Sequence, residues 1–264
     1  MNEQQDTHQN FPPAQRLPLT QRLHLLARIL LSRDPAVREA YVDYHLIRRK
    51  FILSRSCEHF ALNKFEPAPL LNHSLLDIGC GTTRLAEELC FRGAECTAID
   101  INDDVLHLAE RSAQAHGSPV QFLLATAEDL VREGKSYDIV LCLDVLEHVE
   151  DPKRLLWACS KIMGPNGLLV FSTVNRTWRS WFMHILIAQR ILGWLPRNTF
   201  KFKQFIKPDE LEAMLAEHGL YIGNVCGARF DPFAREWLKT DNLALRYMGT
   251  ASRRKHPTPA EDDI

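Results

Sequence analysis

The chain has 264 residues, 45% of them hydrophobic and 25% charged, which is ordinary for a soluble globular protein with one sizeable α/β domain plus extensions. A formal net charge of −1 excludes a global basic field that would recruit nucleic acid. No window has the ~18–20 uninterrupted apolar residues of a membrane span, and the N-terminus lacks the basic-then-apolar opening of a secretory signal. The seven cysteines include no C-x-x-C pair, which favours reduced structural thiols in a cytoplasmic protein.

The N-terminal part of the chain is predicted to consist of a disordered segment followed by a helical one. Residues 1–16 are polar and predict disorder, whereas 17–66 predict a helical extension whose second helix runs from about Pro35 to Ser54. The first helix is indicated by leucines that recur at helical spacing, namely Leu19, Leu23, Leu26 and Leu30. Such a stripe usually covers a core, and the alternative is a lid over a substrate or a helix on a membrane surface.

A glycine-containing loop follows the N-terminal extension. Ser74-Leu-Leu-Asp-Ile-Gly-Cys-Gly-Thr-Thr83 predicts a short buried strand and a tight turn, after which a helical pattern opens at Arg84. Glycine in such a turn lets the backbone approach a ligand that any Cβ would exclude. A second strand, Glu95–Ile99, ends at Asp100, which lies about 20 residues after Gly79, the spacing at which a carboxylate accepts hydrogen bonds from ribose hydroxyls. The segment therefore predicts a nucleotide-type binding unit.

Strands and helices alternate after Asp100. We expect a helix at Asn102–His116, strands at Val120–Leu124 and Tyr137–Cys142, a helix at Pro152–Met163 and a strand at Leu168–Thr173. Alternation of this kind over residues 67–250 predicts a doubly wound α/β domain with a mostly parallel sheet. Ligands of such sheets bind beyond the carboxyl ends of the strands, where Gly79, Asp100 and Leu143 lie.

The stretch between the fifth strand and Pro208 is apolar and basic. Tryptophan and aliphatic residues recur at helical spacing over 178–200, and no Asp or Glu occurs from Pro152 to Pro208. We favour a helix lying in a membrane interface over 178–195, and a lid helix packed on the core is the alternative. The remaining elements complete a seven-stranded sheet with one antiparallel strand before a disordered tail at 251–264: a helix at Asp209–Glu217 and strands at Tyr221–Val225 and Leu243–Met248.

Leu76-Asp-Ile-Gly-Cys-Gly81, together with Asp100 at the end of the next strand, resembles the motifs of class I S-adenosylmethionine-dependent methyltransferases, which have a Rossmann-like fold. The resemblance implies that the loop contacts the amino-acid part of S-adenosylmethionine and that the acidic residue holds its ribose. The cofactor-binding residues expected in the α/β domain are Asp77, Gly79, Gly81, Asp100, Ile101, Ala127, Glu128 and Leu143.

Two of these assignments have alternatives that start from the same residues. Ala127 and Glu128 are expected beside the adenine, but they also suit the N-terminal region of a helix, where the helix dipole favours acidic residues. The glycine loop also suits an NAD-dependent oxidoreductase. That alternative is disfavoured because Arg84 stands where the third glycine of the dinucleotide fingerprint should be.

A charged turn, Leu143-Asp-Val-Leu-Glu-His-Val149, follows the fourth strand. Asp144, Glu147 and His148 have the spacing i, i+3 and i+4, so a helical turn would place them on one face. Two carboxylates and an imidazole in that arrangement could bind a divalent cation. A carboxylate could instead orient His148 as a general base, or the Glu-His pair could simply shape the pocket.

The charged turn and three downstream segments, Phe171–Arg176, Arg179–Trp181 and Lys203–Pro208, resemble the ubiquinone-biosynthesis O-methyltransferase family over about residues 74–248. The resemblance implies methylation of a polyprenylated catechol by S-adenosylmethionine at the inner membrane surface, with other ubiquinone-biosynthesis proteins as partners and no role for nucleic acid. It implies a divalent cation, Mg or Zn, on Asp144, Glu147 and His148, of which Glu147 and His148 are the expected catalytic residues.

The N-terminal third departs from the family pattern. His45-Leu-Ile-Arg48 is the nearest counterpart of the family's Asn-Pro-Leu-Arg cofactor contact, so Arg48 is the expected ligand there. Asp144 also replaces the more usual Glu. These departures leave two alternatives open, a methyltransferase of another small, soluble substrate and a non-catalytic cofactor-binding scaffold in a biosynthetic complex.

Overall fold

A computed structural model of the protein describes residues 44–82, 84–196, 199–231, 234 and 236–253. The predictions for 1–43 and 254–264, namely the disordered N-terminus, the leucine stripe and most of the tail, lie outside these ranges. The described chain opens with a helix, α3 (His45–His59), which extends five residues beyond the predicted end at Ser54.

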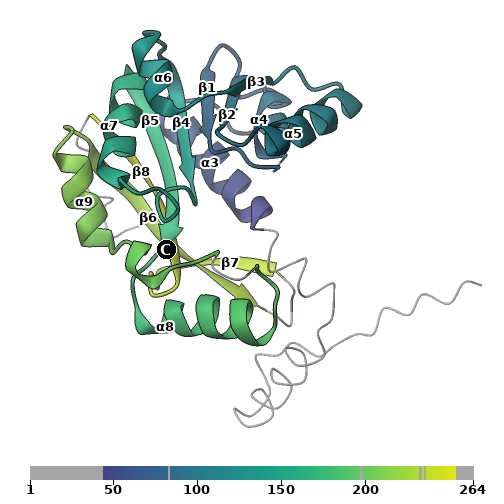
Figure 1. The fold of residues 1–264 in the computed structure, drawn as a ribbon. Helices are drawn as coiled ribbons and strands as arrows, with labels where there is room; N and C mark the ends of the chain where they lie inside the picture. The colour runs from purple at the N-terminus through teal and green to yellow at the C-terminus, as the bar shows by residue number, and fades with distance from the viewer. Residues whose placement is uncertain (1–43, 83, 197–198, 232–233, 235, 254–264) are drawn as a thin grey trace, which may run out of the picture.

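An eight-stranded sheet forms the centre of the protein, in the order β3-β2-β1-β4-β5-β8-β6-β7 (Figure 1). Strands β1 to β5 pair in parallel with their neighbours, whereas β8 is antiparallel to β5 and β6, and β7 is antiparallel to β6. The strands are β1 Ser74–Ile78, β2 Glu95–Asp100, β3 Gln121–Leu124, β4 Tyr137–Leu143, β5 Met163–Val174, β6 Tyr221–Asp231, β7 Glu236–Thr240 and β8 Arg246–Ser252. The predicted doubly wound, mostly parallel sheet is therefore confirmed.

The predicted count of seven strands, one of them antiparallel, is wrong by one strand. The additional strand is β7, which forms a hairpin with β6, so two strands run against the first five. Trp237 of β7 packs on Tyr44 and Phe230, with ring centroids 4.8 and 5.5 Å apart. The sequence Glu-Trp-Leu-Lys-Thr is short and two of its five residues are charged, so it carries no clear alternating pattern. Its pairing with β6 and the contacts of its tryptophan hold it in the sheet.

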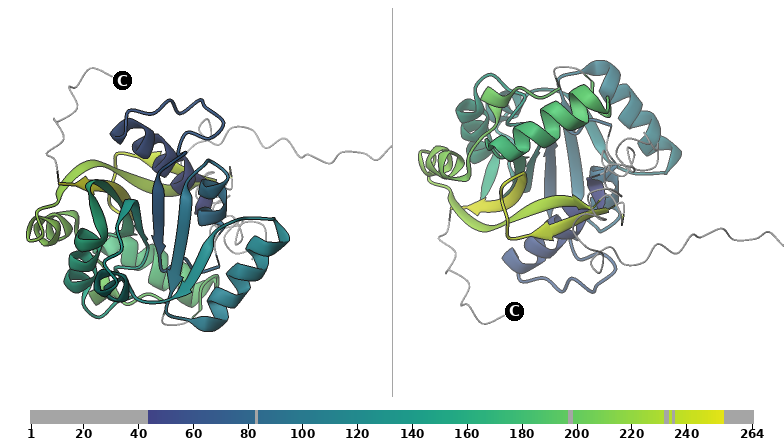
Figure 2. Two further views of the ribbon diagram at one scale, coloured as in Figure 1. Left: turned by 90° about the horizontal axis from the view of Figure 1, so that it is seen from above. Right: turned by 90° about the horizontal axis from the view of Figure 1, so that it is seen from below.

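Helices cover both faces of the sheet. The helices α3, α4 and α5 pack on one face and α6, α7 and α9 on the other (Figures 1 and 2). Strand β4 shows why: Ile139 and Leu141 face one layer of the core, while Val140 and Cys142 face the other, as expected for a strand that is buried on both sides. The helices after α3 are α4 Leu85–Cys90, α5 Asp103–Ala115, α6 Ala127–Arg132, α7 Pro152–Ile162 and α9 Pro208–Ala216.

The starts of α5 and α7 are fixed locally by capping side chains. The side chain of Asn102 accepts a hydrogen bond from the Val105 N–H at the start of α5, and Asp151 caps α7, whose first residue is Pro152. Both arrangements satisfy an N–H group that has no partner inside the helix. Because α5 starts directly after β2, its cap also fixes the carboxyl end of that strand.

A helical segment, α8 (Trp178–Ser180) continued by a π-helical run (Trp181–Ile191), lies on the side of the sheet to which the carboxyl ends of β4 and β5 point (Figures 1 and 2). It buries Ile185 and Ala188 but leaves Trp178 70% and Phe182 41% exposed. Apolar side chains thus occupy its inner face and part of its outer face. Within the described ranges, no helix has the length and apolar character needed to cross a membrane.

Candidate active site

The turn after β1 is built from glycines in left-handed conformations. Gly79 has a φ of +65° and Gly81 a φ of +58°, and the Gly79 N–H donates to the carbonyl of Ile99 at 2.8 Å. A Cβ placed on Gly79 would lie 2.7 Å from a methyl carbon of Val145. Glycine is therefore required there both for its backbone angle and for space. The same contact brings the charged turn after β4 against the glycine loop.

Asp100 lies at the end of β2, beside the glycine turn. Its Oδ2 accepts a hydrogen bond from the Gly81 N–H at 3.1 Å, and its Oδ1 accepts one from the Asn102 N–H at 2.9 Å. Each carboxylate oxygen has a further lone pair, so Asp100 can accept hydrogen bonds from a diol while its orientation stays fixed. The neighbouring Ile101 is 78% exposed and lies at the edge of the same site.

Asp77 is a buried carboxyl group with capacity left for a ligand. It is only 3% exposed, and its Oδ2 has no hydrogen-bond partner among the described residues. Burial raises the pKa of Asp77 to about 7, Arg48 opposes this rise and Asp100 adds to it. A buried polar atom without a partner is unfavourable, so a bound ammonium group would satisfy it. The residues present therefore fit the amino-acid end of S-adenosylmethionine.

Arg48 comes from α3 and reaches the same strand ends. One of its terminal nitrogens lies 3.6 Å from Asp144 Oδ2, and its guanidinium lies 4.8 Å from the centre of the Tyr44 ring. Its positive charge also opposes the rise in the pKa of Asp77. The structure thus places Arg48 beside the turn that follows β4, and its role as a cofactor ligand stays a prediction.

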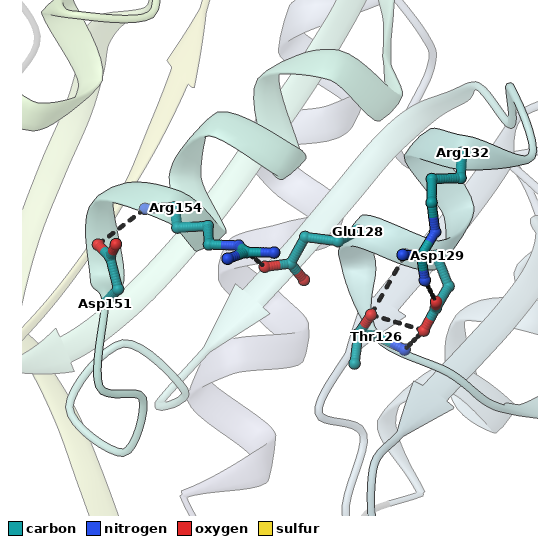
Figure 3. Close-up of polar contacts among 6 residues, drawn as sticks. All are labelled: Thr126, Glu128, Asp129, Arg132, Asp151 and Arg154. Atoms are coloured by element: carbon teal, nitrogen blue, oxygen red, sulfur yellow. Dashed lines mark hydrogen bonds and ion pairs between the residues drawn. The ribbon is translucent and has the colours of Figure 1, made fainter.

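On the opposite side of β2, the predicted adenine residues are engaged with the protein itself. Ala127 is 2% exposed and packs in the core. Glu128 Oε1 accepts a hydrogen bond from Arg154 Nε of α7 at 3.0 Å (Figure 3). Thr126 and Asp129 form a capping box at the start of α6. These contacts match the helix-terminus alternative for Ala127 and Glu128, although the backbone at Ala127 still lies near the end of β3.

The charged turn does not have the helical geometry that its spacing suggested. Asp144 has a φ of +56°, a left-handed conformation that Asp tolerates better than most residues. Its Oδ1 accepts a hydrogen bond from Ser172 Oγ at 2.8 Å, and its Oδ2 lies 3.0 Å from a terminal nitrogen of Arg246. Burial alone would raise the pKa of Asp144, but Arg246 and Arg48 together hold that pKa below its usual value.

Glu147 lies beneath the surface of the site. It is 1% exposed, its Oε2 accepts a hydrogen bond from Thr173 Oγ1 at 2.7 Å, and its Oε1 lies 3.8 Å from Arg246. Burial, reinforced by Asp144, raises the pKa of Glu147 to about 7, and Arg246 opposes the rise. Glu147 is thus placed to hold the turn in position rather than to contact a substrate directly.

The predicted cation site on Asp144, Glu147 and His148 is not supported. Among the described residues, no group of three or more His, Cys, Asp or Glu side chains is arranged to hold a metal ion. The reason is geometric: the left-handed Asp144 breaks the helical turn, and Arg246 lies against the carboxylate oxygen that a cation would need. Only the S-adenosylmethionine part of the cofactor prediction fits these residues.

His148 is the exposed member of the charged turn. Its ring stacks on Phe200, with centroids 5.7 Å apart. Loss of surrounding water lowers the pKa of His148 below its usual value, opposed by Asp144 and reinforced by Arg246, so the imidazole is neutral near pH 7. Within the described part of the chain, neither carboxylate of the turn hydrogen-bonds to the ring. Of the alternatives for the charged turn, orientation of His148 by a hydrogen-bonded carboxylate has no contact among the described residues to support it.

Arg246 is a site residue that the sequence analysis missed. It lies on β8, is 9% exposed, and its guanidinium lies 5.0 Å from the centre of the Tyr44 ring and 6.0 Å from that of Trp237. The available signal was a single arginine in an otherwise apolar stretch, Leu243–Met248. A buried arginine requires an acidic partner, and the charged turn after β4 supplies it.

Comparison with known proteins also indicates a methyltransferase. A family model described as a methyltransferase domain matches residues 46–224. The ubiquinone biosynthesis O-methyltransferase of Rhizobium etli is 35% identical over 205 residues, which cover 78% of this chain and 83% of that protein. The family model therefore includes nearly all of α3, the glycine turn and the charged turn, but not Arg246 of β8.

Solved structures agree in fold. An S-adenosylmethionine-dependent methyltransferase from Clostridium acetobutylicum superimposes with a TM-score of 0.57 at 14% identity, covering 89% of this chain and 98% of that one. Magnesium protoporphyrin IX methyltransferase from Synechocystis, with bound SAH, gives a TM-score of 0.55 at 20% identity, covering 88% and 99%. At such low identities the likeness extends to the Rossmann-like architecture alone.

Proposed function

Because this chain belongs to the ubiquinone biosynthesis O-methyltransferase family, we propose that it transfers a methyl group from S-adenosylmethionine to a hydroxyl oxygen of a polyprenylated catechol. The observation that carries the proposal is the contact between the glycine turn and the charged turn. Gly79 lies directly against Val145, so the cofactor loop adjoins the turn that ends at His148.

Three side chains and the glycine turn suit the parts of the cofactor. Asp100 would accept hydrogen bonds from the ribose hydroxyls, because its two oxygens are already oriented by backbone N–H groups. The unsatisfied oxygen of Asp77 would receive the ammonium group, and Arg48 would pair with the carboxylate. When bound, S-adenosylmethionine supplies a methyl group on a positively charged sulfur. The charge makes the methyl carbon electrophilic, so a phenolate oxygen can attack it.

His148 is the proposed general base. A catechol hydroxyl resembles that of tyrosine, with a pKa of about 10, and is mostly protonated near neutrality. A neutral imidazole can take that proton on a ring nitrogen, and the lowered pKa of His148 keeps the ring neutral at physiological pH. Glu147, held by Thr173 beneath it, would keep the turn rigid.

The apolar tail of the substrate would lie beside the helical segment 178–191. A cavity of about 430 Å³ lies between this segment and the β6–β7 region. Its lining is mainly apolar and includes Trp178, Phe182, Met183, Ala228, Ala244 and Leu245. The exposed Trp178 and Phe182 and the basic residues nearby also suit contact with a membrane surface on the cytoplasmic side, where each basic residue contributes about 1 kcal/mol. A lid that packs only on the core is the alternative.

The test is methyl transfer from labelled S-adenosylmethionine to short-chain polyprenyl catechols, with and without anionic liposomes. We expect transfer to the prenylated catechols, little transfer to unprenylated catechol, and co-sedimentation of the protein with liposomes. Trp178→Ala should weaken co-sedimentation, whereas Trp157→Ala, an exposed tryptophan on α7, should not. Equal rates with both substrates and no liposome binding would favour a soluble substrate. Binding of S-adenosylhomocysteine without transfer to any catechol would favour the scaffold alternative.

A further inference from the structure

Arg246 lies between the two carboxylates to which a cation was assigned by resemblance. One of its terminal nitrogens is 3.0 Å from Asp144 Oδ2 and 3.8 Å from Glu147 Oε1. We propose that the guanidinium of Arg246 takes the place of a divalent metal ion in this protein. The protein then transfers methyl groups without a metal. The proposal rests on the proposed function, whose site it deepens.

The carboxylate oxygens of the cluster are already engaged. Asp144 uses one oxygen for Ser172 and the other for Arg246, and Glu147 uses one for Thr173. A magnesium or calcium ion needs about six oxygen ligands at roughly 2.0–2.6 Å. Of the four carboxylate oxygens, only Oε1 of Glu147 has no hydrogen-bond partner among the described residues, and it already faces the guanidinium. A cation would have to displace Arg246 before it could bind.

The cluster already holds permanent positive charge without a metal. Two guanidinium groups, from Arg48 and Arg246, face the carboxylates of Asp144 and Glu147. Arginine keeps its charge at any pH at which the protein is folded, so this compensation is permanent. A divalent cation in the same place would meet a fixed positive charge within a few ångströms and would be repelled.

Three aromatic rings surround the guanidinium of Arg246 and hold it in this position. Its central carbon lies 5.0 Å from the ring centre of Tyr44, 5.9 Å from that of Phe200 and 6.0 Å from that of Trp237. Aromatic faces attract a guanidinium and do not supply ligands for a hydrated metal ion. Trp237 belongs to β7, so the strand that the sequence did not predict supplies one of these three rings.

Arg246 is therefore a positioning residue for the turn that carries His148. By pairing with Asp144 it holds the residue that directly follows β4, and by facing Glu147 it fixes the far end of the same turn. Its removal would leave two buried carboxylates with reduced compensation, and the turn would move. A displacement of about 1 Å in such a turn can lower a rate by about 100-fold.

The first experiment measures metal directly. The full-length protein, freed of metal with a chelator, is titrated with Mn²⁺ and followed by electron paramagnetic resonance, and its transfer rate is measured with EDTA or with Mg²⁺. We expect no stoichiometric Mn²⁺ binding and the same rate under both conditions. One bound Mn²⁺ per chain, or a rate that depends on Mg²⁺, would overturn the proposal. Mn²⁺ binding requires no turnover, so it decides the proposal even if no catechol is methylated.

The second experiment removes the guanidinium. Arg246→Met should lower kcat by about 100-fold with little change in affinity for S-adenosylhomocysteine, and Arg246→Lys should retain more of the rate. Added guanidinium salt should restore part of the rate of Arg246→Met, which a purely structural loss would not allow. Arg111→Met, which removes an exposed arginine of α5, is the matched control. A full rate in metal-free Arg246→Met would overturn the positioning role, and near-UV circular dichroism shows whether that variant folds.

Discussion

The two halves of the site are built in different ways. The cofactor half, at the ends of β1 and β2, consists of a glycine turn whose backbone hydrogen-bonds to Asp100, and all of it lies in one short stretch of the chain. The acceptor half consists of side chains from the turn after β4 and from β8, where Arg246 pairs with Asp144. Arg48 of α3 lies between the two halves, 3.6 Å from Asp144. The first half is therefore encoded locally, and the second exists only once distant elements have packed together.

The largest expected effect is in the acceptor half. His148→Ala should lower kcat by roughly 10²- to 10³-fold, because general-base catalysis contributes about that much. The affinity for S-adenosylhomocysteine, measured by calorimetry, should not change if the two halves act separately. His107→Ala, at an exposed histidine on α5, is the control. An unchanged kcat in His148→Ala would reduce that residue to scaffolding.

The matching change in the cofactor half is Asp100→Ala. It removes both the proposed ribose acceptor and the support of Gly81, and a hydrogen bond to a charged group contributes about 1.5–3 kcal/mol. We expect S-adenosylhomocysteine to bind about 100-fold more weakly. Asp103→Ala, an exposed aspartate in the first turn of α5, should bind normally. Normal binding by Asp100→Ala would remove the ribose assignment.

The contact between the halves can be tested with two glycines that share a left-handed backbone. Gly79→Ala adds a Cβ 2.7 Å from Val145, whereas Gly134→Ala, with a φ of +67°, meets nothing within 4 Å. Both variants incur the backbone cost of about 1–2 kcal/mol. Overpacking against Val145 should make Gly79→Ala less stable by about a further 1–3 kcal/mol in denaturant unfolding. Equal stabilities would mean that the two turns do not touch.

The smallest predicted effect is a pH dependence of cofactor binding. The pKa of Asp77 is raised to about 7, first of all by burial, so the carboxyl is largely protonated at pH 6 and must lose a proton before it pairs with an ammonium group. Affinity for S-adenosylhomocysteine should therefore rise by about tenfold between pH 6 and pH 8. Asp77→Asn should bind more weakly with no such rise. A pH dependence that survives in Asp77→Asn would have another source.

The difference between the two halves also explains which predictions held. The strand, turn and helix from Ser74 to Arg84 and the position of Asp100 are confirmed, because glycine angles, caps and buried strands depend on neighbouring residues in the chain. The helical turn at Asp144 was wrong, because spacing alone does not reveal that Asp144 takes a left-handed conformation. The eighth strand was missed because its five residues are held by a tryptophan that packs on residues far away in the sequence.

By itself, the sequence determined the doubly wound sheet, the cofactor turn and the family, since each depends on residue types at short, fixed spacing. Only the tertiary structure decided that the guanidinium of Arg246 faces Asp144 and Glu147. The physical reason is that a buried charge must be compensated by whatever opposite charge the fold brings within reach. Arg246 follows Asp144 by about a hundred residues, and the antiparallel pairing of β8 with β5 brings the two together.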